Sequence, residues 1–190
     1  MNIRYIPVGV VLLIMMVVGY SDQYSQLDAM LNNDSLDPSD GVVYRWYKSG
    51  DTLMGVDLSN CLAPGIYCYV AVDNTGQKEV TIGVVKHKIP YQGMPNNIEK
   101  LIRKKMKKKN GVLGYITYVY VREDRRGQGI AKTLLEESFH LISVTIPSFG
   151  AMSLVVRYNN AAAIALYKKV GYELIINITK TGYSYYARYP

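Results

Sequence analysis

A short glycine-containing segment restricts the possible folds of this chain more than any other feature. The apolar run Tyr115–Val121 precedes Arg126-Gly127-Gln128-Gly129, and a helical pattern follows directly. The first turn of a helix has free N–H groups, and glycines allow backbone amides to approach an anion closely. The segment therefore predicts a strand–turn–helix unit that binds a phosphate or pyrophosphate group.

Two common phosphate-binding signatures do not fit this segment. A dinucleotide-binding turn needs Gly-x-Gly-x-x-Gly, and Lys132 occupies the position of the third glycine. A P-loop needs Gly-Lys followed by Ser or Thr, which the segment also lacks. The anion must therefore be held by another kind of loop.

Two motifs in this half of the chain resemble those of a known enzyme family. Arg126, Gly129 and Ala131 form an Arg-x-x-Gly-x-Ala signature. A second motif follows, made of Asn160, Ala163, Leu166, Tyr167, Lys169, Gly171 and Tyr172. Together they resemble motifs A and B of the GNAT-fold N-acetyltransferases, most closely the branch that acetylates protein N-termini, including ribosomal proteins.

The resemblance implies one α/β domain over residues 1–190, with a mixed central sheet and two central strand–helix units. The sequence agrees with this expectation. Residues 21–65 are polar and turn-rich and indicate no clear element. The expected strands are 66–74 and 78–89, which form a hairpin, then 114–121, 152–158, 172–179 and 183–189; the expected helices are 129–142 and 161–170.

The resemblance also implies that acetyl-CoA is the co-substrate. In the family the glycine loop binds the pyrophosphate, and the backbone of the preceding strand pairs with the pantetheine arm where two strands separate. Asn160 is in addition a candidate N-cap. The expected cofactor-binding residues are Val119, Tyr120, Val121, Arg126, Gly127, Gln128, Gly129, Ile130, Ala131, Lys132, Thr133, Asn160 and Lys169.

By the same resemblance, Tyr167 is the general acid that protonates the departing thiolate. A phenol with a pKa of about 10 is protonated at neutral pH and can serve in this way. The ribosomal-protein branch has a glutamate base twelve residues before this tyrosine, and Val155 stands there in this chain. Tyr115 is the candidate that remains, because some N-terminal acetyltransferases use a tyrosine at this strand position to order a water.

The expected activity is acetyl transfer to a primary amine, with a protein N-terminal α-amine favoured. An α-amine has a pKa of about 7.7–8.0 and is partly neutral without a strong base, whereas a lysine amine is not. The alternatives are acetylation of a small-molecule amine, or a CoA-binding GNAT-like module with weak or no catalysis. The N-terminal-acetylating branch carries a Tyr-Tyr pair in a long loop, but Tyr185-Tyr186 falls in or near the last expected strand.

A single segment accounts for the net charge of +7. Lys100–Lys109 holds seven basic residues and no acid, so the rest of the chain is neutral overall. This run lies in an expected insertion, residues 88–112, and indicates a solvated loop or short helix. The alternatives for the run are an acidic partner, RNA or a nuclear-localisation signal.

Two cysteines and two histidines indicate no metal site. Cys61 and Cys68 are expected either to form one disulfide or to remain free thiols.

The N-terminal residues 1–21 contain the uncharged run Val8–Val18. The run is shorter than the roughly 18–20 residues of a membrane-spanning helix. A core strand and helix is the preferred interpretation, and a membrane anchor or secretion signal in residues 6–20 is the alternative. A cytoplasmic location is favoured because acetyl-CoA is chiefly an intracellular metabolite.

Overall fold

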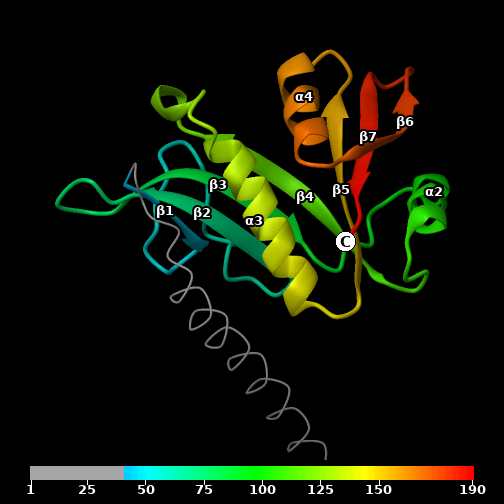
Figure 1. The fold of residues 1–190 in the computed structure, drawn as a ribbon, viewed down its shortest axis with the longest axis horizontal. Coiled ribbons are helices and arrows are strands. Elements are labelled where there is room, and N and C mark those ends of the chain that lie inside the picture. Colours follow the sequence, from blue (N-terminus) through cyan, green and yellow to red (C-terminus); the bar gives the residue numbers. More distant parts are fainter. Residues whose placement is uncertain (1–40) are drawn as a thin grey trace, which may run out of the picture. The chain divides into compact units, whose positions relative to one another are not determined.

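Residues 41–190 are the part of the chain that the computed structural model describes, and their strands form one mixed sheet (Figure 1). The strand order in the sheet is β1-β2-β3-β4-β5-β7-β6, and only β4 and β5 run parallel. The strands are β1 Val42–Trp46, β2 Ile66–Asp73, β3 Val80–Lys88, β4 Val112–Val121, β5 Phe149–Arg157, β6 Glu173–Ile178 and β7 Tyr183–Arg188.

Three α-helices and one 3-10 helix connect these strands. Helices α3 and α4 follow the parallel strands β4 and β5 and form the two expected strand–helix units. The mixed sheet and these units confirm the predicted fold class. The helices are α2 Asn96–Lys105, η1 Glu123–Arg125, α3 Ile130–Thr145 and α4 Ala161–Lys169.

The boundaries differ from the predicted ones by a few residues, and one strand was missed. Strands β4 and β5 begin earlier than expected, and α3 continues to Thr145. Strand β1 lies in the polar region for which the sequence indicated no element. It pairs with β2 and has only one buried residue, Val42, so its sequence lacks the strong apolar pattern of a central strand.

Helix α3 packs closely on one face of β2, β3 and β4, as Figure 1 shows. Leu134, Leu135 and Ile142 of the helix are almost fully buried there. A Cβ atom added to Gly83 of β3 would lie 3.1 Å from the Leu134 side chain and 3.3 Å from that of Ile130. A glycine at this position therefore lets the helix approach the sheet.

Helix α2 covers part of the opposite face. Ile98, Ile102 and Met106 are buried against Leu113 and neighbouring strands, and the lysines of the run lie outside this apolar stripe. The segment between β3 and β4 is therefore a short helix with its own apolar core contact, followed by an exposed basic turn. The loop between β1 and β2 covers the other part of this face, through Leu53, Leu58 and Cys61.

The predictions for residues 1–21, including the run Val8–Val18 and the anchor or signal in residues 6–20, fall outside the described residues. In residues 41–190 no helix is both long enough and apolar enough to cross a membrane.

Candidate active site

The sheet opens between its two parallel strands. Strand β4 pairs with β5 only from Val112 to Tyr115, and the last pair is Tyr115 with Ser153. Beyond it, β4 continues beside β3 to Val121, while β5 continues beside β7. A β-bulge lies close to the point where β4 leaves β5. The pairing of β4 with β3 shifts register there, between Lys86 and His87. Bulges bend and twist a strand, and this one accompanies the separation.

The glycine segment lies at the end of the separated part of β4. Gly127 and Gly129 have φ angles of 79° and 83°, a left-handed conformation that favours glycine. A Cβ atom at either position would meet nothing within 4 Å, so both backbones face open space. No described acceptor receives a hydrogen bond from the N–H groups of residues 127–131. We call these five residues the amide loop.

The amide loop has the properties of an anion site. Five N–H groups without an acceptor among the described residues lie at the N-terminus of the 16-residue helix α3, where the helix dipole adds a partial positive charge. Arg126 precedes the loop; its Nε donates to the carbonyl oxygen of Val121 over 3.1 Å, and its guanidinium lies 5.8 Å from the ring centre of Tyr120.

The remaining residues predicted at the cofactor lie on α3 and α4. Lys132 in the first turn of α3 pairs with Glu136, and Thr133 is half-buried. Asn160 caps α4: its Oδ1 accepts a hydrogen bond from the N–H of Ala163 over 3.1 Å. Lys169 is exposed in the last turn of α4. The predicted N-cap role of Asn160 is confirmed. The contacts of these residues with acetyl-CoA stay predictions.

Tyr167 comes from α4 on the same side of the sheet as α3. It packs on the apolar cluster that includes Leu134 and Phe139 of α3, and its ring lies 5.9 Å from that of Tyr172. Burial raises the pKa of Tyr167, so its hydroxyl stays protonated at neutral pH. This protonation state is the one that a proton donor needs.

Ile116, the next residue along β4, packs on the α3 side of the sheet. Because successive side chains of a strand point to opposite faces, Tyr115 points to the other side. Its ring stacks on that of Tyr91, with 4.4 Å between ring centres. Burial is the main cause that raises the pKa of Tyr115, followed by electrostatic interaction with Tyr91, Tyr185 and Tyr167. The two tyrosines predicted to be catalytic are therefore within electrostatic range of each other at the opening of the sheet.

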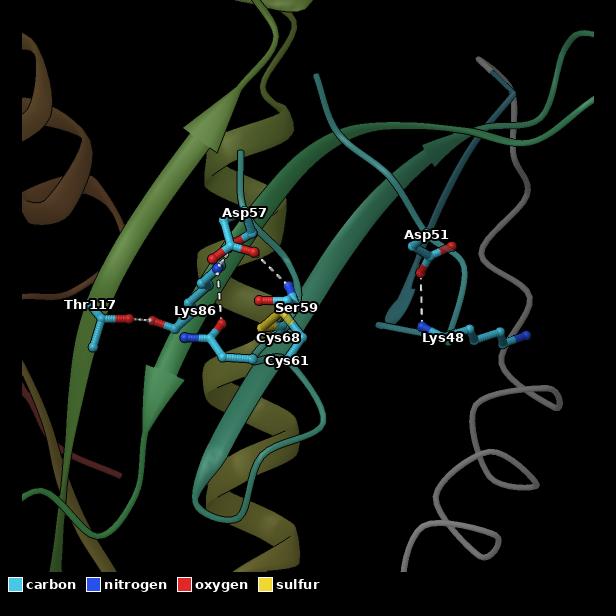
Figure 2. Close-up of a disulfide and its surroundings, with 9 residues drawn as sticks. Lys48, Asp51, Asp57, Ser59, Cys61, Cys68, Lys86 and Thr117 are labelled. Carbon is cyan, nitrogen blue, oxygen red and sulfur yellow. Dashed lines mark hydrogen bonds between the residues drawn. A yellow bond between two sulfur atoms is a disulfide. The ribbon is translucent and has the colours of Figure 1, made fainter. Parts of the chain in front are cut away.

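A tethered loop borders the same side as Tyr115. A disulfide joins Cys61 in the β1–β2 loop to Cys68 in β2, which decides between the two expected states of the cysteines (Figure 2). The side chain of Lys86 in β3 donates hydrogen bonds to the carbonyl oxygen of Asp57 and to Oδ1 of Asn60. These bonds hold residues 57–61 against β3, close to the bulge of β4.

No carboxylate is placed to act as a base on these tyrosines. The groups that raise the pKa of Tyr115 and Tyr167 include no acid. Nine of the ten carboxylate side chains in residues 41–190 pair with a basic side chain or a tyrosine, and Asp57 accepts a hydrogen bond from the N–H of Ser59. The same residues contain no group of side chains that could hold a metal ion.

The sequence did not single out two of the residues beside Tyr115. Tyr91 belongs to the segment assigned to a basic insertion, and Lys88 is the last residue of β3 and pairs with Tyr115 across the strands. Their proximity depends on strand register and on the path of the chain into α2, which no local motif encodes. Tyr185 was noted, and the structure brings it into range of Tyr115 from β7.

Comparison with known proteins matches the chain to one family. The sequence model described as the acetyltransferase (GNAT) family matches residues 27–172, more than half of the chain. No curated protein sequence matches the chain.

Several solved structures share the fold. NAA60 from Arabidopsis thaliana in complex with acetyl-CoA is 25% identical, with a TM-score of 0.61 over 78% of this chain and 99% of that chain. The NatC complex bound to Gag peptide and CoA is 19% identical, with a TM-score of 0.54 over 78% and 98%. A GNAT family acetyltransferase from Elizabethkingia anophelis with acetyl-CoA bound is 12% identical, with a TM-score of 0.53 over 80% and 99%.

Proposed function

The chain belongs to the GNAT acetyltransferase family and uses acetyl-CoA, and we propose that its acceptor is the N-terminal α-amine of a protein or peptide. The observation that carries this proposal is the pair Tyr115 and Tyr167 where β4 separates from β5, without a carboxylate base, with the amide loop beyond the other end of the separated part of β4. NAA60 in complex with acetyl-CoA is among the similar structures, which supports acetyl-CoA as the co-substrate.

In the proposed mechanism the amide loop binds the pyrophosphate of acetyl-CoA. The pantetheine arm then follows the separated edge of β4, where the backbone of Val119–Val121 no longer pairs with β5. This path brings the thioester to Tyr167. Its hydroxyl donates a proton to the thiolate as the amine nitrogen forms the new amide bond.

The acceptor amine loses its proton through an ordered water. The raised pKa of Tyr115 makes its phenolate a rare species at neutral pH, so the phenol itself is a poor base. Its hydroxyl can instead orient a water that carries the proton to solvent. This route suits an α-amine with a pKa of about 7.7–8.0, which is already partly neutral, better than a lysine amine with a pKa of about 10.4.

One feature favours a small amine as the second candidate acceptor. The turn between β6 and β7 comprises only residues 179–182, so it cannot form a long arm over a bound peptide. A small amine would need no such arm. The two candidates differ in the acceptor alone, because both use the same cofactor and the same tyrosines.

Acetylation assays with matched acceptors test the proposal. The chain and acetyl-CoA are incubated with a peptide that has a free α-amine, with the same peptide blocked at its N-terminus but containing lysine, and with a polyamine and an aminoglycoside. Thiol release and the mass of the acceptor are measured. We expect the free peptide to gain one acetyl group at its α-amine. Acetylation of the polyamine or aminoglycoside with no reaction of the peptide would overturn the peptide acceptor.

A further inference from the structure

The two sides of the sheet opening differ in what they can bind. The amide loop and Tyr167 belong to the side covered by α3 and α4, so the proposed cofactor approaches from there. The acceptor must then reach the thioester from the opposite side. On that side, within residues 41–190, the β1–β2 loop and α2 cover the two flanks, and Lys88, Thr117 and Tyr118 between them are exposed. We call Lys88, Tyr115, Thr117 and Tyr118 the acceptor face.

The acceptor face carries one uncompensated positive charge. Lys86, the other lysine at this end of β3, is buried, and its ammonium donates hydrogen bonds to the carbonyl oxygen of Asp57 and to Oδ1 of Asn60 in the β1–β2 loop (Figure 2). Lys88 is exposed, and its ammonium forms no side-chain hydrogen bond or ion pair with any residue in the described part of the chain.

Strand register places Lys88 directly beside Tyr115. The two residues are cross-strand partners in the antiparallel pair β3–β4. Side chains of such partners lie on the same face of the sheet, with Cβ atoms about 4.5–5.5 Å apart. The four-carbon stem of lysine lets the ammonium reach a group that is bound over the tyrosine.

From these observations we infer that Lys88 selects acceptors that carry an acidic group close to the reacting amine. The inference rests on the proposed function and names the peptide class: N-termini whose second or third residue is Asp or Glu. The ammonium of Lys88 pairs with that carboxylate.

Two peptides that differ only in charge test this inference. One has Asp as its second residue, and the other has Asn. We expect the full chain to acetylate the Asp peptide with a kcat/KM about fivefold higher, in the range of an exposed charge-assisted contact. The preference should weaken at high salt, because salt screens exposed charges.

Variants assign the preference to one side chain. Lys88→Gln should remove the preference, and Lys88→Arg should retain it. Lys104→Gln removes an equal charge from the exposed part of α2 and should keep it, which controls for net charge. Acetyl-CoA affinity should be the same in all four proteins, since Lys88 lies on the other side of the sheet.

The outcomes separate this inference from the proposed function. Equal rates on the Asp and Asn peptides, a preference that survives Lys88→Gln, or an equal loss in Lys104→Gln would overturn the role of Lys88 alone. If the chain acetylates neither peptide while polyamines react, both the peptide acceptor and the role of Lys88 are wrong.

Discussion

The proposed cofactor side and the proposed acceptor side of this molecule are built in different ways. The proposed cofactor side uses backbone groups from one continuous segment, residues 127–131, in which two glycines adopt a left-handed conformation before a helix and the N–H groups have no acceptor among the described residues. The acceptor side uses side chains from β3, β4, β7 and the segment before α2, brought together by strand register. A site made of backbone can be recognised from a short motif, and a site made of side chains from distant segments cannot. Substitutions should therefore separate the two sides.

Gly129→Asp should have the largest effect, on the cofactor side. A carboxylate at this position would lie beside the pyrophosphate, and we expect acetyl-CoA affinity to fall at least about 100-fold because of charge repulsion. Gly129→Asn is the matched control: it adds a similar side chain in the same left-handed conformation without the charge, and Asn tolerates this conformation well. Calorimetric titration of the two variants measures the difference. Equal affinity in Gly129→Asp and the unchanged chain would mean that the pyrophosphate binds elsewhere.

Tyr167→Phe should have the second largest effect, and it should lower kcat rather than acetyl-CoA affinity. The substitution keeps the ring that packs on the α3 side and removes the hydroxyl. We expect kcat to fall about 10²-fold, the usual effect of losing a proton donor, with acetyl-CoA affinity unchanged. Tyr158→Phe, at an exposed tyrosine, is the control.

The pH profile sharpens this prediction. Because burial raises the pKa of Tyr167, the hydroxyl remains protonated beyond its usual range. The rate should therefore rise with pH as the acceptor amine loses its proton, and it should not fall again below about pH 10. A folded Tyr167→Phe variant with normal turnover would show that this tyrosine only packs in the core.

Replacement of both Cys61 and Cys68 by Ser should affect the acceptor side by a smaller amount. The disulfide closes a short loop, so we expect a loss of about 2–3 kcal/mol in the free energy of unfolding. The β1–β2 loop borders the acceptor face, and we expect the KM for the acceptor to rise several-fold while acetyl-CoA affinity stays constant. A change in acetyl-CoA affinity with an unchanged acceptor KM would contradict the separation of the two sides.

The lysine run should have the smallest effect. Replacing the exposed Lys104, Lys105, Lys107, Lys108 and Lys109 with Gln leaves the buried stripe of Ile98, Ile102 and Met106 intact. The ion pair of Lys105 with Glu173 is exposed on both sides and contributes about 1 kcal/mol at most. We expect the rate on a neutral peptide to change less than about threefold. A large loss of rate on that peptide would show that the lysine run is part of the active site.

The fold class could be predicted from the sequence because it depends on local patterns, and the proposed cofactor side rests on the same patterns and stays a prediction. The apolar strand before the glycines and the helix after them fixed the first strand–helix unit, and the cap at Asn160 fixed the start of the second. Strand β1 was missed because its residues lie at the sheet edge and are only partly buried. Lys88 and Tyr91 were missed because their place beside Tyr115 follows from register and from the path into α2. The pairing of the cysteines stayed open for a similar reason, since it depends on how the β1–β2 loop folds back onto β2.

The most direct test of the central claim is an amide-shift titration of the labelled chain by NMR, first with acetyl-CoA and then with an acceptor peptide. The account predicts that acetyl-CoA shifts the N–H signals of residues 127–131 and Val119–Val121 most strongly. The peptide should then shift Lys88 and Tyr115 and leave the amide loop nearly unchanged. Unshifted signals from residues 127–131 in saturating acetyl-CoA would contradict the account.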